Sequence, residues 1–273
     1  MSDDTSRPLK GLGVFGRANQ RMLERWPSAV DDMLWRDMVL LTSETAPQLY
    51  RPPAPLRYEK GSRPELEHFL ERAIQDISQA EGKVRAIAEA VSQWARAFEE
   101  TPASRDFDNW RFGGTEESIL ARGSDNCAEV ARLACALFQV FGLPARLALL
   151  ADTEKAYSGH TVCEVFYKNA WGAVDPLTNV VYQHPDGRPA NLWDLHRSAA
   201  LVEQHSAPSR TYTYPGQFQV VAISHYDIAE AKRYDYIETP INDYVRAIWK
   251  MSEAGWPGGL HWLFGEDEAT TRS

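Results

Sequence analysis

A cysteine at the start of a helix, followed along the chain by a histidine and an aspartate, is the pattern in this sequence that could do chemistry. Cys127 follows Asn126, a residue type preferred as a helix N-cap, and Glu129 stands three positions after Asn126, as in a capping box. The helix that this predicts runs through Phe141 and ends at Gly142. Free backbone N–H groups at a helix start favour a thiolate. Cys127 is therefore a candidate nucleophile.

The histidine and the aspartate lie in a predicted β-hairpin over residues 159–179. A two-residue turn at Lys168 and Asn169 places Asp175 as the diagonal neighbour of His160 on the same face of the sheet. The backbones of such neighbours are ~7–8 Å apart, within reach of side chains. His160 could then act as the base for Cys127 while Asp175 orients the imidazole, as covalent acyl transfer requires.

Other residues near this pattern are expected to pack in the core or to line the site. We expect Cys135, on the flank of the helix, and Cys163, on the opposite face of the strand from His160, to be packed thiols. The backbone N–H of Cys127 is one expected donor to an oxyanion. Candidates for a second donor or for a residue lining the cleft are Asn109, Trp110 and Asn126.

The elements that must position these residues form a helical first half followed by short strands. Helices are expected over residues 27–41, from Ser62 (with Glu65 completing a capping box), and over residues 84–98, 186–206 and 240–252; strands are expected over residues 145–150, 160–167, 171–175 and 220–224. This order indicates an α+β fold. We divide the chain into an N-terminal helical extension with a Pro-rich connector (1–60), a core (61–185) and a mostly helical C-terminal addition packed on the core (186–273).

The stretch from about residue 83 to 182 resembles the catalytic domain of the transglutaminase-like superfamily, whose members are papain-like cysteine enzymes. The resemblance rests on Cys127 at a helix start, on GLPAR at 142–146, on H-x-V-x-E from His160 to Glu164 and on W-x-x-V-D-P from Trp171 to Pro176. It implies a Cys-bearing helix packed on an antiparallel sheet that carries the other two residues, with Cys127 as nucleophile, His160 as base and Asp175 as orienter. Many members have an aromatic residue two positions after the histidine, where this chain has Val162.

The resemblance implies a thioester-forming enzyme that acts on an amide. We slightly prefer hydrolysis, as by a peptidase or amidase, to amine transfer, because hydrolysis needs no second binding site. A second resemblance, carried by the surround from Arg122 to Glu129, is to the arylamine N-acetyltransferases, which use acetyl coenzyme A. A non-catalytic scaffold or peptide-binding module is the third alternative, and loss of a triad residue would be its sign.

Composition narrows the classes of partner. The formal net charge of −9 argues against nucleic acid and anionic membranes. No run of signal-peptide or membrane-spanning length is found, and three cysteines without a framework spacing suit a reducing compartment, so we expect a cytoplasmic protein. The histidines and cysteines lack the spacing of a metal site, and GLGVFG at 11–16 has no preceding strand for a dinucleotide, so no cofactor is expected. The expected partner is a peptide or amide-containing substrate, and the oligomeric state stays open.

Overall fold

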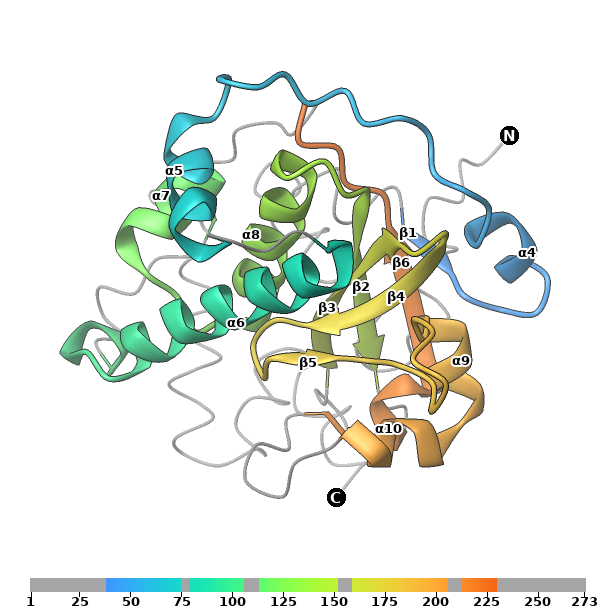
Figure 1. The fold of residues 1–273 in the computed structure, drawn as a ribbon. Coiled ribbons are helices and arrows are strands. Elements are labelled where there is room, and N and C mark those ends of the chain that lie inside the picture. Colours follow the sequence, from blue (N-terminus) through green and yellow to red (C-terminus); the bar gives the residue numbers. More distant parts are fainter. Residues whose placement is uncertain (1–37, 75–78, 106–112, 152–158, 206–212, 230–273) are drawn as a thin grey trace, which may run out of the picture.

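One antiparallel sheet forms the centre of the molecule. The computed structural model describes residues 38–74, 79–105, 113–151, 159–205 and 213–229. Within them, six strands are hydrogen-bonded in the order β1-β6-β2-β3-β4-β5 (Figure 1). Their bounds are β1 (Met38–Leu40), β2 (Ala145–Ala151), β3 (Gly159–Tyr167), β4 (Ala170–Asp175), β5 (Val180–Val181) and β6 (Val220–Ser224). The predicted α+β class is confirmed.

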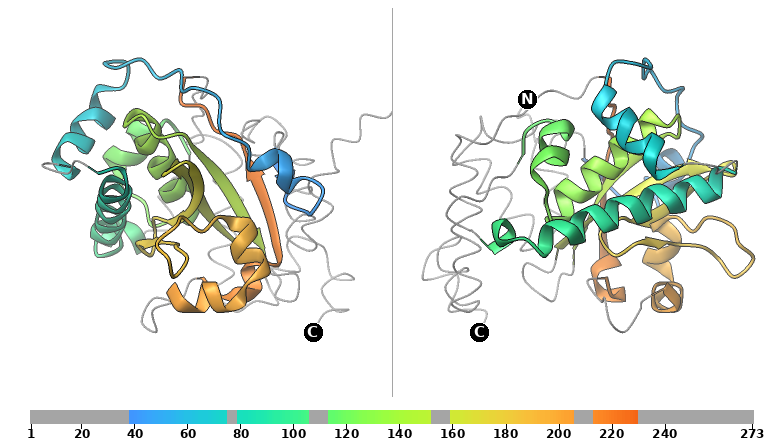
Figure 2. Two further views of the ribbon diagram at one scale, coloured as in Figure 1. Left: turned by 45° about the vertical axis from the view of Figure 1, so that its right-hand side comes forward. Right: turned by 60° about the vertical axis from the view of Figure 1, so that its left-hand side comes forward.

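Helices cover both faces of this sheet. The helices of the described residues are α4 (Ala46–Leu49), α5 (Pro64–Ala73), α6 (Ala80–Glu99), α7 (Glu116–Arg122), α8 (Cys127–Val140), α9 (Leu192–Arg197) and α10 (Ala199–His205), with short 3-10 turns η2 (Pro102–Arg105) and η3 (Pro215–Gln219). Figure 2 shows α5, α6, α7 and α8 gathered on one side of the sheet, and α4, α9 and α10 away from them. The site described below lies between these two layers.

The first layer is built around α8. This helix is apolar on almost every side because it is covered by α5, α6 and α7 as well as by the sheet. Its core contacts β2, β3 and β4 through Leu147, Cys163 and Val174, which point to the same face. Alternation along a strand therefore sends the residues between them to the other face.

The second layer uses those alternate residues. Ala148, Val162 and Ala173 pack on the other face of the sheet, in a cluster with side chains of α4, α9, α10 and η3. Much of this cluster comes from beyond residue 186. The C-terminal segment is thus needed to bury the second face of the sheet, at roughly 25 cal/mol per Å² of apolar surface removed from water.

The hairpin of β3 and β4 has the predicted two-residue turn. Lys168 and Asn169 have positive φ values of 51° and 58°, the conformation of a type I′ turn that matches the twist of the strands. Tyr167 then pairs with Ala170, which fixes the register of the whole hairpin. This part of the prediction is confirmed.

The N-terminal helix prediction is wrong at its end. Residues 38–40 form strand β1, which pairs with β6 at the edge of the sheet, because pairing supplies backbone partners that a helix end there lacks. Residues 27–37 lie outside the described residues, as do the motif at 11–16 and the helix expected over 240–252.

Two helix boundaries also differ from the prediction. Helix α5 begins at Pro64 and Ser62 does not cap it: its hydroxyl donates to the carbonyl of Glu59, so the expected capping box with Glu65 is absent. The helix expected over residues 186–206 begins only at Leu192. It divides at Ser198, the residue between α9 and α10.

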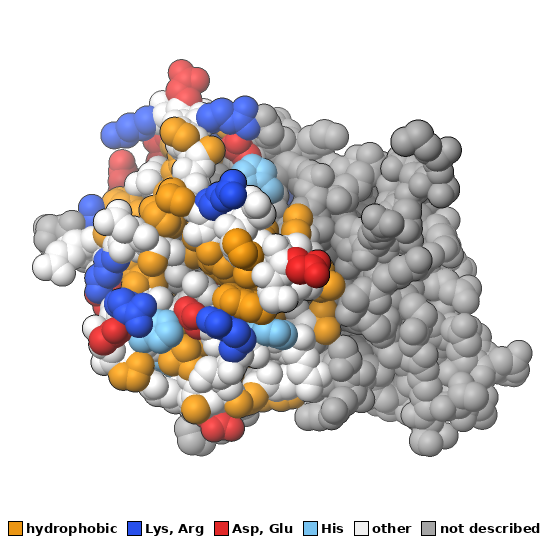
Figure 3. All heavy atoms as spheres, turned by 90° about the vertical axis from the view of Figure 1, so that its right-hand side faces the viewer, with side chains coloured by type: hydrophobic (Ala, Val, Ile, Leu, Met, Phe, Trp, Pro, Cys, Tyr) orange, Lys and Arg blue, Asp and Glu red, His pale blue; other side chains and the backbone are white. Residues whose placement is uncertain are grey.

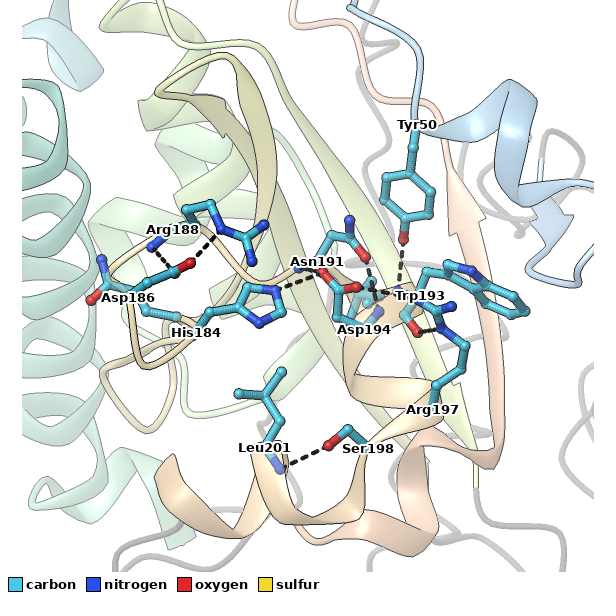
Figure 4. Close-up of polar contacts among 12 residues, drawn as sticks. Tyr50, His184, Asp186, Arg188, Asn191, Trp193, Asp194, Arg197, Ser198 and Leu201 are labelled. Atoms are coloured by element: carbon cyan, nitrogen blue, oxygen red, sulfur yellow. Dashed lines mark hydrogen bonds and ion pairs between the residues drawn. The ribbon is translucent and has the colours of Figure 1, made fainter.

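The start of α9 has a capping box that we did not predict. Asn191 accepts from the backbone of Asp194 and the Asp194 carboxylate accepts from the backbone of Asn191, so α9 starts where these two side chains meet (Figure 4). His184 lies against the same carboxylate, with 3.1 Å between Nε2 and Oδ2. The cap therefore also fixes α9 against the loop that follows β5.

Both flanking segments are tied to the core through one buried glutamate. Glu164 on β3 accepts hydrogen bonds from the Tyr50 hydroxyl at 3.0 Å and from the Leu192 backbone at 2.8 Å, and Arg146 donates to it twice. The Tyr50 hydroxyl in turn accepts from the backbone of Trp193 on α9 (Figure 4). The segment before residue 60 and the segment after residue 186 therefore meet on the central sheet.

Among the described residues, the molecular surface around α9 is neither uniformly charged nor uniformly hydrophobic. Basic, acidic, histidine and hydrophobic side chains are intermingled on its visible surface (Figure 3). None of the described helices has the length and hydropathy needed to cross a membrane.

Candidate active site

Cys127 is the first residue of α8, as predicted. Asn126 is the N-cap, and its side-chain oxygen accepts from the backbone N–H of Ala128 at 3.0 Å. The helix ends at Val140, with Gly142 just beyond at a φ of 93°. Cys127 is half-buried, whereas most of the helix after it is buried. The thiol therefore lies at the positive end of a helix of fourteen residues.

His160 and Asp175 meet where the strands of the hairpin separate. His160 is 3% exposed and Asp175 is 0% exposed. The His160 Nε2 and the Asp175 Oδ2 are 2.9 Å apart. The diagonal contact expected from a two-residue turn is present, because the register that pairs Tyr167 with Ala170 carries through to these positions.

The Cys127 thiol and the imidazole influence each other's ionisation. His160 lowers the pKa of Cys127, and Cys127 in turn raises that of His160; the backbone of Thr161 also lowers the pKa of the thiol. Since Nε2 of the ring is engaged by Asp175, Nδ1 is the nitrogen left for the thiol. The start of α8 thus lies against the start of β3, with the ring between sulfur and carboxylate.

The charges of the three groups favour a thiolate beside an imidazolium. Burial alone would raise the pKa of Cys127, but the hydrogen bond and charge of His160 lower it below its ordinary value. Burial would lower the pKa of His160, yet the Asp175 charge and the two hydrogen bonds raise it to about 10. Burial also opposes ionisation of Asp175, but the His160 charge and the hydrogen bonds from His160 and Thr178 together outweigh it, so the pKa of that carboxyl is lowered.

Asp175 is oriented by its own backbone turn. Its Oδ1 accepts from the backbone N–H groups of Leu177 and Thr178 at 3.1 and 3.3 Å, in the manner of an Asx turn. That leaves Oδ2 for His160. The dipeptide Asp175-Pro176 therefore turns the chain and aims one carboxylate oxygen at the ring.

Glu129 does not complete the capping box that we predicted. Its carboxylate turns instead to the loop before α8, where it accepts from the backbone N–H of Gly113 and the hydroxyl of Ser124, both at 2.6 Å, and pairs with Arg122. Because the carboxylate is only 2% exposed, these donors outcompete the N-cap backbone. The prediction of a box is therefore wrong, although that of the cap itself is confirmed.

This network holds the loop that leads into the nucleophile. The Ser124 hydroxyl accepts from the backbone N–H of Asn126, so a chain of hydrogen bonds joins Glu129 to the residue before Cys127. Gly123 directs the chain into this loop with a φ of 84°, and a side chain there would collide with Phe98. Sequence reasoning missed this role because the partners meet only in the folded chain; the acidic Glu129 in the first turn of a mostly apolar helix was the available signal.

The other predicted site residues divide into two groups. Asn126 lies beside Cys127, with its Oδ1 committed to the helix cap. Asn109 and Trp110 lie outside the described residues. Their predicted role near the thiol therefore stays a prediction.

The remaining cysteines are buried between α8 and β3. Cys135 and Cys163 are both 0% exposed and share a hydrogen bond, and the Cys163 thiol donates to the carbonyl of Ala131 at 2.9 Å. Burial, reinforced by Cys163, raises the pKa of Cys135 well above its ordinary value. Both are packed thiols, as expected.

No set of three His, Cys, Asp or Glu side chains that could hold a metal ion occurs in the part of the chain that the structure describes. A cysteine, a histidine and an aspartate at these positions would supply a nucleophile, a base and a residue that orients the base. Such an arrangement can form and break a covalent acyl intermediate.

Comparisons with known proteins find a family similarity over part of the chain. Residues 68–176 match the model of the transglutaminase-like superfamily. A solved structure described as "Crystal structure of a TGase" is similar to 44% of this chain at 16% sequence identity, with a TM-score of 0.33. The chain spans only 34% of that protein. No curated protein matches the chain.

Proposed function

We propose that this chain, whose residues 68–176 match the model of the transglutaminase-like superfamily, is a cysteine-dependent acyl-transfer enzyme acting on an amide. The family is compatible with cysteine acyl transfer or hydrolysis. The observation that supports the proposal most directly is the buried His160–Asp175 pair, with 2.9 Å between Nε2 and Oδ2. Cys127 lies at the start of α8, and His160 lowers the pKa of its thiol.

The first step is attack of the Cys127 thiolate on the amide carbonyl. A sulfur–carbon bond forms and the carbonyl electrons move to oxygen. The backbone N–H of Cys127, at the first helical position, has no acceptor within its own helix and is the proposed donor to that oxyanion. Collapse breaks the carbon–nitrogen bond, and the leaving amine takes a proton from the His160 imidazolium.

The second step resolves the thioester. His160, now neutral, removes a proton from water, and the resulting attack on the thioester releases a carboxylic acid and restores the thiolate. Asp175 holds the ring in position through both steps and stabilises its charged form. We prefer water to an amine as acceptor because hydrolysis needs no second binding site.

Intact-mass analysis after exposure to p-nitrophenyl acetate tests the proposal. We expect one acetyl group on the wild-type protein, none above background on Cys127→Ala, and acetylation slower by about 10²-fold or more in His160→Ala. Cys135→Ala is the matched control, because it removes a buried thiol of the same helix that contacts neither His160 nor Asp175 in the described structure; it should acetylate like the wild type.

Two further measurements identify the acyl acceptor and the class of acyl donor. Loss of the acetyl group in buffer alone supports hydrolysis, and its transfer to added glycine methyl ester at a faster rate supports amine transfer. If acetyl coenzyme A acetylates Cys127 faster than p-nitrophenyl acetate does, the protein is instead of the arylamine N-acetyltransferase type. Equal acetylation of wild type and Cys127→Ala would contradict the proposal and leave a non-catalytic scaffold.

A further inference from the structure

The segment after residue 205 contributes to the centre of the molecule, although it lies beyond the family match at 68–176. Strand β6 pairs with β2 along five residues and with β1 on its other side. Past β6, the backbone of Tyr226 accepts from the Gln139 side chain at 2.5 Å, and the backbone of Ile228 donates to it at 2.8 Å. This segment is therefore bonded to the sheet and to the helix that begins at Cys127.

His160 and Asp175 point to the face of the sheet that this C-terminal part covers. Cys163 and Val174 pack against α8, whereas Val162 and Ala173 pack against the layer of α9, α10 and η3. Residues two positions from Val162 and Ala173 share their face. By this alternation His160 and Asp175 belong to the face that the C-terminal layer buries.

One polar side chain of that layer reaches the carboxylate. The Thr213 hydroxyl, at the start of the described segment and 5% exposed, donates to the Asp175 Oδ2 across 3.4 Å. This is the same oxygen that faces the His160 Nε2. Thr213 also shares a hydrogen bond with the hydroxyl of Tyr182, which follows β5 and is itself buried.

The donor between Thr213 and Asp175 follows from the groups themselves. An ionised carboxylate only accepts, so the Thr213 hydroxyl donates to Asp175. Burial and the Asp175 charge raise the pKa of Tyr182, which keeps its phenol protonated and uncharged beside this bond. The oxygen that holds the ring therefore has a hydroxyl donor from the C-terminal segment.

We propose that Thr213, supported by Tyr182, is a positioning residue for the Asp175–His160 pair, so that the segment outside the family core completes the active site of this enzyme. The inference rests on the proposed function, since it assigns Thr213 a role only through His160 and Cys127. The hydroxyl holds Oδ2 on the ring while the Asx turn holds Oδ1.

The test measures iodoacetamide labelling of Cys127 in the full chain as a function of pH, which needs no substrate. We expect Thr213→Val, which keeps the shape and removes the hydroxyl, to raise the thiolate pKa and to lower the labelling rate at neutral pH by roughly threefold to tenfold, the size of one ordinary hydrogen bond, because the thiol feels the loss only through Asp175 and His160. Thr213→Ser should restore labelling to within about twofold. Tyr182→Phe should move it in the same direction as Thr213→Val, but less.

Ser224→Ala is the matched control. It removes another buried hydroxyl of the same segment, at the end of β6 that pairs with Leu147 rather than with the strand end beside His160. Its labelling should equal that of the wild type. Thermal unfolding of every variant separates positioning from stability, and Thr213→Ala replaces Thr213→Val if the latter does not fold.

The outcomes distinguish this inference from the proposed function. A wild-type Cys127 that labels like an ordinary thiol overturns the proposed function and this inference with it. A lowered wild-type thiolate pKa that Thr213→Val and Thr213→Ala leave unchanged, even with reduced thermal stability, overturns only the role of Thr213. Failure of Thr213→Ser to restore labelling would overturn it as well, because the hydroxyl would then not be what matters.

Discussion

At the scale of single residues, the site depends on a fully buried carboxylate. Asp175 has no exposed surface, and its charge is balanced by His160 and by the N–H groups of its own turn. A buried ion is costly unless it is paired, so removing either partner leaves the other as an unfavourable buried charge. The positive charge on the His160 ring in turn stabilises the Cys127 thiolate.

Replacing Asp175 by Asn therefore affects the Cys127 thiol indirectly, through His160. The imidazole loses the charge that raises its pKa, its positive form becomes less favourable, and the Cys127 thiolate loses its partner. We expect acetylation by p-nitrophenyl acetate to fall by about 10²-fold or more. Asp194→Asn is the control, because it removes the carboxylate of a second His–Asp contact, with His184, and should leave acetylation unchanged. Equal losses in the two variants would contradict the assignment.

The pH dependence of acylation follows from the two pKa shifts. The rising limb reports Cys127, whose pKa is lowered, and the falling limb reports His160, whose pKa is raised to about 10. Because both thiolate and imidazolium are required, the rate should rise at a pH below the ordinary thiol value of 9.0 and stay high until the ring deprotonates well above neutrality. A profile that already falls near 6.5, the ordinary value of His, would show that the ring is unperturbed.

At the scale of elements, the start of α8 decides where the thiol lies. Asn126 caps the helix at the residue before Cys127, and the Glu129 network fixes the loop in front of the cap. Both act within a few residues of the sulfur. The cap can therefore be tested apart from any direct role of Asn126 in catalysis.

Asn126→Ala should lower the free energy of unfolding by about 1 kcal/mol through loss of the cap. Asn126→Ser keeps a capping oxygen and removes the amide N–H₂, so it should unfold like the wild type in urea titrations. If Asn126→Ser retains stability and loses acylation, the amide is the second oxyanion donor. If its acylation also stays, the amide serves only as a cap. A wild-type stability for Asn126→Ala would contradict the capping role seen in the structure.

The elements that could be predicted from sequence are those fixed by local signals. The ends of α8 follow from Asn126 and Gly142, and the hairpin follows from a two-residue turn between alternating segments, so His160 and Asp175 could be placed together before any coordinates. The contacts of the Glu129 side chain could not be predicted, because its donors Gly113 and Arg122 approach it only after α7 packs on α8. Strand β1 was missed for the same reason, since three residues at a sheet edge depend on β6.

At the scale of the whole molecule, a second buried carboxylate joins segments that are far apart in sequence. Glu116 at the start of α7 is 1% exposed and binds Arg132 on α8, Arg63 before α5 and the hydroxyl of Tyr226 after β6. The family match lacks two of these partners, since it runs from residue 68 to 176. The contacts of Glu116 thus join both flanking segments to the core.

Glu116 should therefore make stability fall in acid. Burial alone would raise its pKa, but the charges of Arg132 and Arg63 lower it to about 2, below the unfolded value of 4.5. Its contribution is present above the unfolded pKa and is lost as the pH falls from about 4.5 toward 2, on the order of 3 kcal/mol in total. Urea unfolding across this range should show the loss in the wild type and a flatter dependence in Glu116→Gln. A wild type whose slope matches that of Glu116→Gln would contradict this role.

The most direct test of the central claim is the apparent pKa for alkylation of Cys127, measured in the wild type and in His160→Ala with the site of labelling read by peptide mass. Our account predicts that Cys127 is labelled before Cys135 and Cys163, with an apparent pKa below that of an ordinary thiol, and that His160→Ala raises this pKa and slows labelling near neutral pH. Labelling of Cys127 with an ordinary or raised pKa that His160→Ala leaves unchanged would contradict it.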